Sequence, residues 1–172
     1  PLSLSIATMT LVSQSIGANR QERAEEIGWS SVFFTTALCI VIGIAVWMFR
    51  VQLLDLYDPP PEVKAFSIPL FLFIAFYQVF DALQVCSAFI LRGYRVAFIP
   101  MWIYAISLWG GGLGGGYLLG FNVTGNIPEY IQGAKGFWLA NSASLALAAA
   151  LLMTLFIRTA HQFEKEHPPV TT

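Results

Sequence analysis

Long runs without charge are the feature that most restricts how this chain of 172 residues can fold. A helix that crosses the hydrocarbon core of a bilayer needs about 20 mostly apolar residues, because the core is about 30 Å thick. Five stretches meet or nearly meet this requirement, and the predicted spans are about 1–19, 27–49, 65–91, 96–120 and 136–157, with a polar tail over 158–172. Lipid offers unpaired backbone N–H and C=O groups no partner. The sequence therefore predicts an all-α fold, a polytopic membrane helix bundle of about five transmembrane helices.

The composition excludes several classes of protein. Charged residues make up 11% of the chain and hydrophobic residues 56%, and the mean hydropathy is +0.66. A compact soluble domain, with about 25% charged residues on average, exposes too much surface to cover with so few charges. The formal net charge of -1 excludes a general nucleic-acid binder, which needs a basic surface. The strongly apolar composition also excludes a disordered chain.

Residues with catalytic or metal-binding chemistry are few. Cys39 and Cys86 each lie inside an apolar run, so we expect buried packing rather than a disulfide framework or a zinc site. His161 and His167 lie in the charged tail without further metal-ligating residues. No HExxH motif, aspartyl dyad or histidine near a nucleophile occurs at membrane depth. We therefore expect that the protein is not an enzyme and needs no cofactor.

Basic residues in the loops predict the orientation of the chain. Six lie on one side of the membrane (Arg20, Arg23, Arg92, Arg95, Arg158 and Lys165) and three on the other (Arg50, Lys64 and Lys135). The positive-inside rule makes the side with six the cytoplasmic one, so the tail and C-terminus are predicted to be cytoplasmic. Five spans then place the N-terminus outside. Because Pro1 opens directly onto an apolar run, we expect a fragment of a longer protein.

Asp81 is the single charge inside the span over 65–91. It lies three positions beyond the midpoint of that span, or about 4.5 Å along a helix. A carboxylate at this depth costs roughly 2.5–3.5 kcal/mol on insertion scales, so we expect Asp81 to face a cavity or a partner. A carboxyl group that alternates between a protonated and an ion-bound form can couple ion flow to transport. The alternative is a structural Asp81 that caps a helix break or bonds to a neighbouring helix.

Helical neighbours of Asp81 support a cation site. Tyr77, Asp81, Gln84 and Ala88 follow the spacing of one helix face. The hydroxyl of Tyr77 and the amide of Gln84 could orient the carboxylate or complete an oxygen shell for a hard cation. Asp81, Tyr77 and Gln84 are therefore the predicted cation-binding residues, and sodium at Asp81 is the only metal expected.

Proline and glycine positions bear on the shape of the helices. Pro69 is either tolerated near the start of its helix or kinks it. The stretch Gly110–Gly116 contains GxGxxG but lacks the strand and acidic residue of a dinucleotide site. Its overlapping GxxxG spacings predict close approach of another helix, and the alternative is a hinge. Ala140, Ser144 and Ala148 form a similar small-residue face in the last span.

The loop over residues 53–64 is acidic. Asp55, Asp58 and Glu62 stand against Lys64, and three prolines stiffen the loop. Net acidity at an outer mouth would attract cationic solutes, which makes Asp55 and Asp58 candidate substrate-attracting residues. The alternative is an ordinary solvated loop. A glycosylation sequon is also present at residues 122–124.

Two motifs resemble a known transporter family. The segment LVSQSIGANRQERA at residues 11–24 resembles the end of the second helix in one half of a multidrug and toxic compound extrusion (MATE) transporter. The segment YQVFDALQ at residues 77–84, followed by LRG at 91–93, is similar to the tenth helix of the NorM-type bacterial branch. The five spans match helices eight to twelve, so the resemblance covers essentially the whole chain, as a C-terminal part.

The resemblance implies twelve helices in two six-helix lobes, cytoplasmic termini and a cavity between the lobes. It also implies export of cationic, often aromatic drugs across the bacterial inner membrane in exchange for sodium ions or protons. The position matched by Asp81 couples cations in NorM-type members, and Tyr77 matches a residue beside it, whereas Gln84 is inferred from helical geometry alone. The implied partners are membrane lipid, cationic drugs and the missing N-terminal lobe, and no nucleic acid.

Departures from the family pattern leave two rivals. The first lobe and the seventh helix, which supplies an acidic cation ligand, are absent from this chain, so the chain alone is not expected to complete a transport cycle. A lipid-linked substrate flippase of the same superfamily would share the helices, but its lumen should carry basic residues. A non-transporting membrane scaffold would use the glycine and alanine faces for packing, and Asp81 would only fix a helix in place.

Overall fold

The computed structural model describes residues 1–123, 125, 127–128 and 131–166. Its helices are α1 (Leu2–Gly17), α2 (Gln21–Met48), α3 (Arg50–Asp55), α4 (Pro61–Ser67), α5 (Leu70–Gly93), α6 (Phe98–Tyr104), the π-helix η1 (Ala105–Gly114), α7 (Gly115–Gly120) and α8 (Ala134–Glu166). Within the described ranges the chain contains no β-strand. The predicted all-α class is confirmed.

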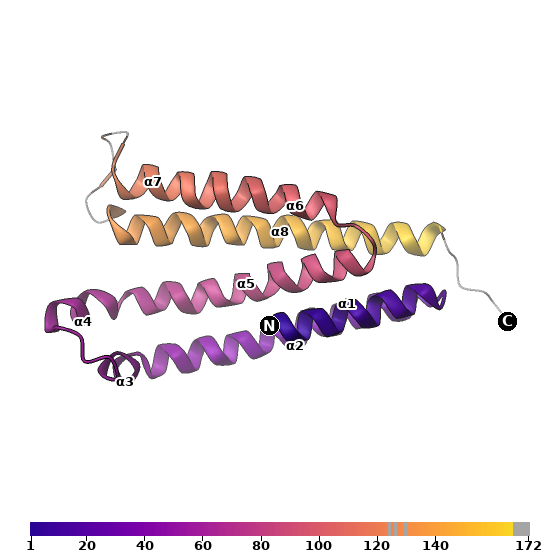
Figure 1. Cartoon of the computed structure of the whole chain (residues 1–172), viewed down its shortest axis with the longest axis horizontal. Coiled ribbons are helices and arrows are strands. Elements are labelled where there is room, and N and C mark those ends of the chain that lie inside the picture. Colours follow the sequence, from indigo (N-terminus) through magenta and orange to yellow (C-terminus); the bar gives the residue numbers. More distant parts are fainter. Residues whose placement is uncertain (124, 126, 129–130, 167–172) are drawn as a thin grey trace.

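The long helices lie side by side in alternating directions (Figure 1). Helix α5 packs against α1, α2 and α8, and α8 also packs against η1 and α7. The α1–α2 turn, the α5–α6 turn and the C-terminal end of α8 lie at one end of the bundle, whereas α3, α4 and the α7–α8 connection lie at the other (Figure 1). Helix α5 is thus central, and its side chains face three neighbours.

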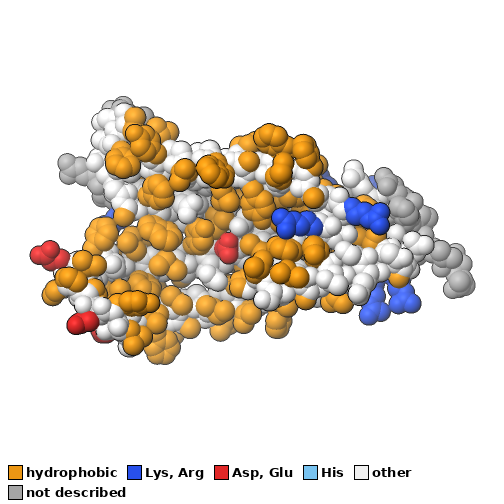
Figure 2. Space-filling view, in the orientation of Figure 1, with side chains coloured by type: hydrophobic (Ala, Val, Ile, Leu, Met, Phe, Trp, Pro, Cys, Tyr) orange, Lys and Arg blue, Asp and Glu red, His pale blue; other side chains and the backbone are white. Residues whose placement is uncertain are grey.

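Three helices among the described residues are long and apolar enough to cross a membrane: Gln21–Met48, Leu70–Gly93 and Ala134–Lys165. Helix α1 is apolar but shorter, with 16 residues. Hydrophobic side chains cover α2 and α5 on the face shown in Figure 2, with acidic side chains at the α3–α4 end and basic ones toward the opposite end. This arrangement agrees with the predicted membrane helix bundle.

The helix predicted over 65–91 is interrupted. Helix α4 ends at Ser67, Ile68 and Pro69 form a turn, and α5 begins at Leu70. Proline has no N–H to donate, and its ring clashes with the carbonyl of the preceding turn. Pro69 therefore separates two helices and is not accommodated within one.

Other helices extend beyond the predicted spans. Helix α2 begins at Gln21 rather than near residue 27, and α8 continues into the predicted tail as far as Glu166. A polar helix end can project past the hydrocarbon, so helix length sets only an upper limit on the span. The last residues of the tail, including His167, and Thr124 of the sequon lie outside the described residues.

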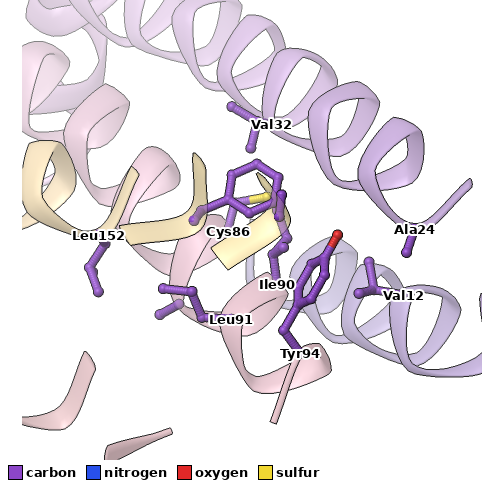
Figure 3. Packing of buried hydrophobic residues seen from close by; sticks show 11 residues of the cluster. Val12, Ala24, Val32, Cys86, Ile90, Leu91, Tyr94 and Leu152 are labelled. Atoms are coloured by element: carbon purple, nitrogen blue, oxygen red, sulfur yellow. The ribbon is translucent and has the colours of Figure 1, made fainter. Parts of the chain in front are cut away.

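The hydrophobic core lies where α1, α2, α5 and α8 meet, toward the end that carries the α1–α2 turn. Figure 3 shows side chains from these helices converging; the buried cluster comprises Val12, Ala24, Val32, Cys86, Ala88, Ile90, Leu91, Tyr94, Leu152, Phe156 and Ala160.

Cys39 and Cys86 are both free and buried, so their predicted packing role is confirmed. Burial, with a smaller contribution from Glu25, raises the pKa of Tyr94, just past α5, from 10.0 to about 12, so its phenol stays neutral.

Glycines allow the core helices to approach closely. A Cβ at Gly28 of α2 would lie 2.8 Å from the Phe156 ring of α8. A Cβ at Gly93 of α5 would lie 2.8 Å from Val12 Cγ1 and 3.2 Å from the Met9 carbonyl oxygen of α1. Because the carbonyl belongs to helical backbone, it cannot rotate away as a side chain can. The α1–α5 contact therefore requires a glycine at position 93.

The substitution Gly93→Ala should destabilise the protein by about 1–3 kcal/mol, the usual cost of overpacking. The measurement is thermal unfolding of the detergent-purified full-length protein. Gly17→Ala is the matched control, because Gly17 is helical and nothing lies within 4 Å of an added Cβ. Equal unfolding temperatures for the two variants would contradict the close contact between α1 and α5.

Candidate functional site

The predicted cation-binding residues all lie on α5. The helix runs without interruption from Leu70 to Gly93, so Tyr77, Asp81 and Gln84 follow one another along the same face. Asp81 and Tyr77 are half-buried and Gln84 is buried. These three side chains therefore form a polar strip along α5, called the Asp81 strip below.

Asp81 and Gln84 form a hydrogen-bonded pair. The Gln84 Nε2 donates to Asp81 Oδ1 across 3.1 Å. The other amide atom, Gln84 Oε1, is buried and has no hydrogen-bond partner among the residues that the structure describes. A buried acceptor without a partner costs free energy comparable to a lost hydrogen bond, about 1–3 kcal/mol. The pair therefore leaves one amide oxygen for a ligand that donates a proton or carries positive charge.

The charge of Asp81 has no basic partner among the residues that the structure describes. The ion pair formed there joins Lys64 to Asp55, and Glu164 lies beside the imidazole of His161. A lone carboxylate in a membrane helix is costly unless it is protonated, binds a cation or faces water. Asp81 thus meets the physical requirement for an ion-binding or proton-binding group.

Groups from two other helices approach the same strip. The Tyr77 ring packs edge-on against Trp138 of α8, with ring centroids 6.0 Å apart and an interplanar angle of 85°. Its hydroxyl interacts with Asn141, also on α8. On the α6 side, the Tyr104 hydroxyl donates to the Gln84 backbone oxygen across 3.4 Å. The site is therefore held between α5, α6 and α8.

The sequence did not indicate three residues that lie at this site: Tyr104, Trp138 and Asn141. For Tyr104 a signal was available, because α5 and α6 form an antiparallel hairpin, and Gln84 and Tyr104 are equidistant from Tyr94 near its turn. Residues equidistant from a tight turn lie opposite each other. For Trp138 and Asn141 no such signal exists, since α8 reaches α5 only through tertiary packing.

The acidic loop lies apart from this strip. Asp55, at the end of α3, forms an ion pair with Lys64 of α4. Asp58 lies between the two helices, exposed, with a φ of 44°. Figure 1 places α3 and α4 at one end of the bundle, beyond the start of α5. The structure therefore does not bring Asp55 and Asp58 together with Asp81.

The glycine-rich stretch packs on α8. A Cβ at Gly112 would lie 2.9 Å from Asn141 Oδ1, and one at Gly116 would lie 2.8 Å from the Phe137 ring. Gly110 has open space instead. The predicted close helix approach is thus confirmed for the 112/116 spacing, and of the small-residue face on α8 the glycines meet Ser144 and Ala140.

The same stretch adopts π-helical hydrogen bonding from Ala105 to Gly114. Within this stretch the Ser107 carbonyl accepts a hydrogen bond from the Ser144 hydroxyl of α8. Local π adjustment keeps the backbone polar groups paired, which lipid demands. Asn141 therefore lies between the two features: it is next to Gly112 of this segment and interacts with the Tyr77 hydroxyl of α5.

We expect Ser144→Ala to destabilise the protein by about 0.6 kcal/mol, the average for an interhelical hydrogen bond in a membrane. Ser13→Ala is the control, because the exposed Ser13 hydroxyl donates only to Met9 of its own helix. Reversible unfolding of the purified full-length protein in mixed micelles measures both. No difference between the variants would show that the η1–α8 bond contributes nothing.

Within the described ranges, no group of three or more His, Cys, Asp and Glu side chains could hold a metal ion. Asp81 and Gln84 carry oxygen atoms, the ligand type that hard cations prefer. A bundle of membrane-length helices with an unpaired carboxylate on its central helix is typical of membrane transport proteins.

Comparison with known proteins identifies the family. The MatE family profile matches residues 1–118, and the chain belongs to this family. This confirms the MATE resemblance predicted from residues 11–24 and 77–93.

Curated relatives match nearly the whole chain. It is 38% identical over 151 residues to a probable multidrug resistance protein NorM of Aromatoleum aromaticum, covering 88% of this chain and 32% of that protein. It is 35% identical over 161 residues to multidrug resistance protein MdtK of Yersinia pestis, covering 92% and 34%. The NorM protein of Neisseria meningitidis serogroup B is 30% identical over 99% of this chain and 36% of its own length. The chain thus spans about a third of the length of these relatives.

A solved structure shares the fold. The crystal structure of the eukaryotic MATE transporter AtDTX14 superimposes with a TM-score of 0.80 at 20% identity, covering 96% of this chain and 37% of that one. The predicted helix arrangement of a MATE transporter is confirmed at the level of fold.

Proposed function

We propose that the full-length protein containing this chain is a secondary active transporter that exports cationic drugs in exchange for sodium ions or protons. Family membership and the multidrug resistance names of its NorM and MdtK relatives support drug export. One observation carries the coupling assignment: Asp81 has no basic partner among the described residues and is bonded to Gln84, whose second amide atom is buried and unpaired.

In this proposal the coupling ion binds at Asp81. A sodium ion would take oxygen ligands from Asp81 and Gln84, with Tyr77 nearby, whereas a proton would sit on the carboxyl group itself. Either event removes an uncompensated charge from the bundle. The ion can favour one arrangement of the whole transporter only by its difference in affinity for the two arrangements. Binding at Asp81 would thus favour the form that releases drug outward.

The proposal places the protein in the bacterial inner membrane with the C-terminus in the cytoplasm. The basic turns at Arg20 and Arg92 and the C-terminal end of α8 lie at the same end of the bundle (Figure 1). The positive-inside rule assigns that end to the cytoplasm. The rest of the drug pathway would come from parts of the full-length protein outside this chain, including the other lobe.

We expect Asp81→Asn to abolish ion-driven efflux, because asparagine keeps the size but cannot bind a proton or balance a cation. The measurement is ethidium efflux from cells that express the full-length protein, with sodium and pH varied separately. The ion that drives the wild type identifies the coupling ion.

Gln84→Leu should raise the ion concentration for half-maximal efflux about tenfold, as loss of a ligand-orienting group does.

Glu164→Gln is the matched control, since Glu164 is an exposed carboxylate that pairs with His161 near the end of α8. Its efflux should equal the wild type at equal membrane abundance. If Asp81→Asn also transports normally, Asp81 has a structural role, as the scaffold alternative requires, and the coupling assignment is wrong.

The outer loop carries a second, smaller proposal: Asp58 attracts cationic drug to the mouth of the pathway. Asp55 is already paired with Lys64, so Asp58 is the exposed acid of the α3–α4 connection. We expect Asp58→Asn to raise the KM for ethidium at low salt and to leave kcat unchanged. Because salt screens exposed charges, the difference should vanish near 1 M salt, where the Debye length is about 3 Å. A KM difference that persists at high salt would contradict an electrostatic cause.

A further inference from the structure

An apolar groove of about 590 Å³ runs between α2 and α5, and neither the core nor the Asp81 strip accounts for it. Its walls come from Ile44 and Trp47 on α2 and from Leu72, Phe76 and Phe80 on α5, and none of the described residues that line it is charged. The two helices meet at its floor, where a Cβ on Gly43 would lie 3.2 Å from the Ala75 carbonyl oxygen. The groove is therefore closed on the inside and open to the surroundings of the bundle.

The walls of this groove belong to helices of membrane length, so within this chain its open side faces away from the bundle toward the space that lipid would fill in a bilayer. Both walls belong to the helices Gln21–Met48 and Leu70–Gly93, which are long and apolar enough to cross a membrane. Figure 2 shows hydrophobic side chains over these two helices. A volume of this size falls within the range of about 300–1,000 Å³ that holds small molecules. An acyl chain fits the all-apolar walls.

A positively charged side chain, that of Arg50, lies at one end of the groove. The Arg50 guanidinium lies over the Trp47 ring, with Cζ 4.6 Å from the ring centroid. Its Nη1 donates to the Trp47 backbone oxygen across 2.6 Å, which fixes the side chain beside the groove. In the part of the chain that the structure describes, no carboxylate forms an ion pair with Arg50. A guanidinium has five N–H donors, so donors remain for an anion.

We propose that the α2–α5 groove binds an anionic phospholipid, with an acyl chain against Trp47 and Phe76 and the phosphate on Arg50. Guanidinium and phosphate form paired hydrogen bonds of matching geometry, which strengthens the contact beyond simple charge attraction. The same charge disfavours a cationic drug, because the groove has no acid to balance it. This lipid site is independent of ion coupling at Asp81.

The experiment titrates lipid into the purified full-length protein and counts bound lipid by native mass spectrometry. Phosphatidylglycerol and phosphatidylcholine with identical acyl chains are the probes. One arginine beside a lipid headgroup contributes about 1 kcal/mol, so the wild type should bind phosphatidylglycerol about fivefold more tightly. We expect Arg50→Gln to remove this preference and to leave phosphatidylcholine binding unchanged.

Arg92→Gln is the matched charge control. Arg92 also lies over an aromatic ring, with Cζ 4.8 Å from the Phe89 centroid, but at the opposite end of α5 and away from the groove. It should keep the fivefold preference. Equal lipid preference in Arg50→Gln and the wild type, or no preference in the wild type, would overturn the proposal.

A second pair of variants tests the acyl chain. Leu72 lines the groove and is 48% exposed, so Leu72→Trp should fill the groove and weaken binding of both lipids. Leu118→Trp is its control, because Leu118 is similarly exposed, at 45%, and does not line the groove. If Leu72→Trp binds lipid like Leu118→Trp, another part of the full-length protein covers the groove and the lipid assignment is wrong. Arg50→Gln alone decides the question if Leu72→Trp does not fold.

Discussion

The absence of water from the bilayer core is the constraint on which this structure depends. Every backbone N–H and C=O there must find a partner within the protein, and only helices supply one for each residue along the chain. This explains why the stretch Gly110–Gly116, which would be poorly helical in water, remains helical here. It takes up π hydrogen bonding, and the Ser144 hydroxyl pairs with the carbonyl of Ser107. Pro69, which cannot donate, lies instead at the junction between two helices.

Close helix contact is the second consequence, because apolar side chains gain little by leaving lipid for each other. Association then depends on packing at short range and on small residues that allow it. Gly93 brings α1 against α5, Gly28 brings α2 against α8, and Gly112 and Gly116 bring the η1–α7 segment against α8. Helix α5 is thereby held between neighbours. Gly93 in particular holds α5, the helix that carries Asp81, close to α1.

Much of the fold could be predicted from the sequence, because charge-free runs and helix length are local properties. The all-α class, the buried cysteines and the helix face of Asp81 follow from residues near one another in the chain. The break at Pro69 was left undecided, since a proline near a helix start is tolerated or not according to its surroundings. The apolar run predicted the span over 136–157 but not that the charged residues after it continue the same helix to Glu166.

The candidate site was predictable only on α5. Helical spacing relates Tyr77, Asp81 and Gln84 to one another, but it says nothing about which atoms are paired. The unpaired amide oxygen of Gln84 and the contact between Tyr77 and Trp138 depend on side-chain rotamers and on α8, which is distant in sequence. Likewise, the pairing of Asp55 with Lys64 depends on how α3 and α4 meet, so composition alone overstated the free acidity of the loop.

Many charged side chains that the structure describes form no ion pair, and among them Asp81 lies within a membrane-length helix and Arg50 beside the apolar groove. Lys64 and Asp55 form an ion pair in the α3–α4 loop region. Neither Asp81 nor Arg50 has a side chain of opposite charge within ion-pair distance among the described residues. Asp81 and Arg50 belong to membrane-length helices or their immediate ends, where a buried charge is expensive. They cannot neutralise each other, because Arg50 lies over Trp47 beyond the end of α2 while Asp81 is bonded to Gln84 within α5. Under our two proposals each charge meets a ligand from outside this chain, a coupling cation at Asp81 and a lipid phosphate at Arg50.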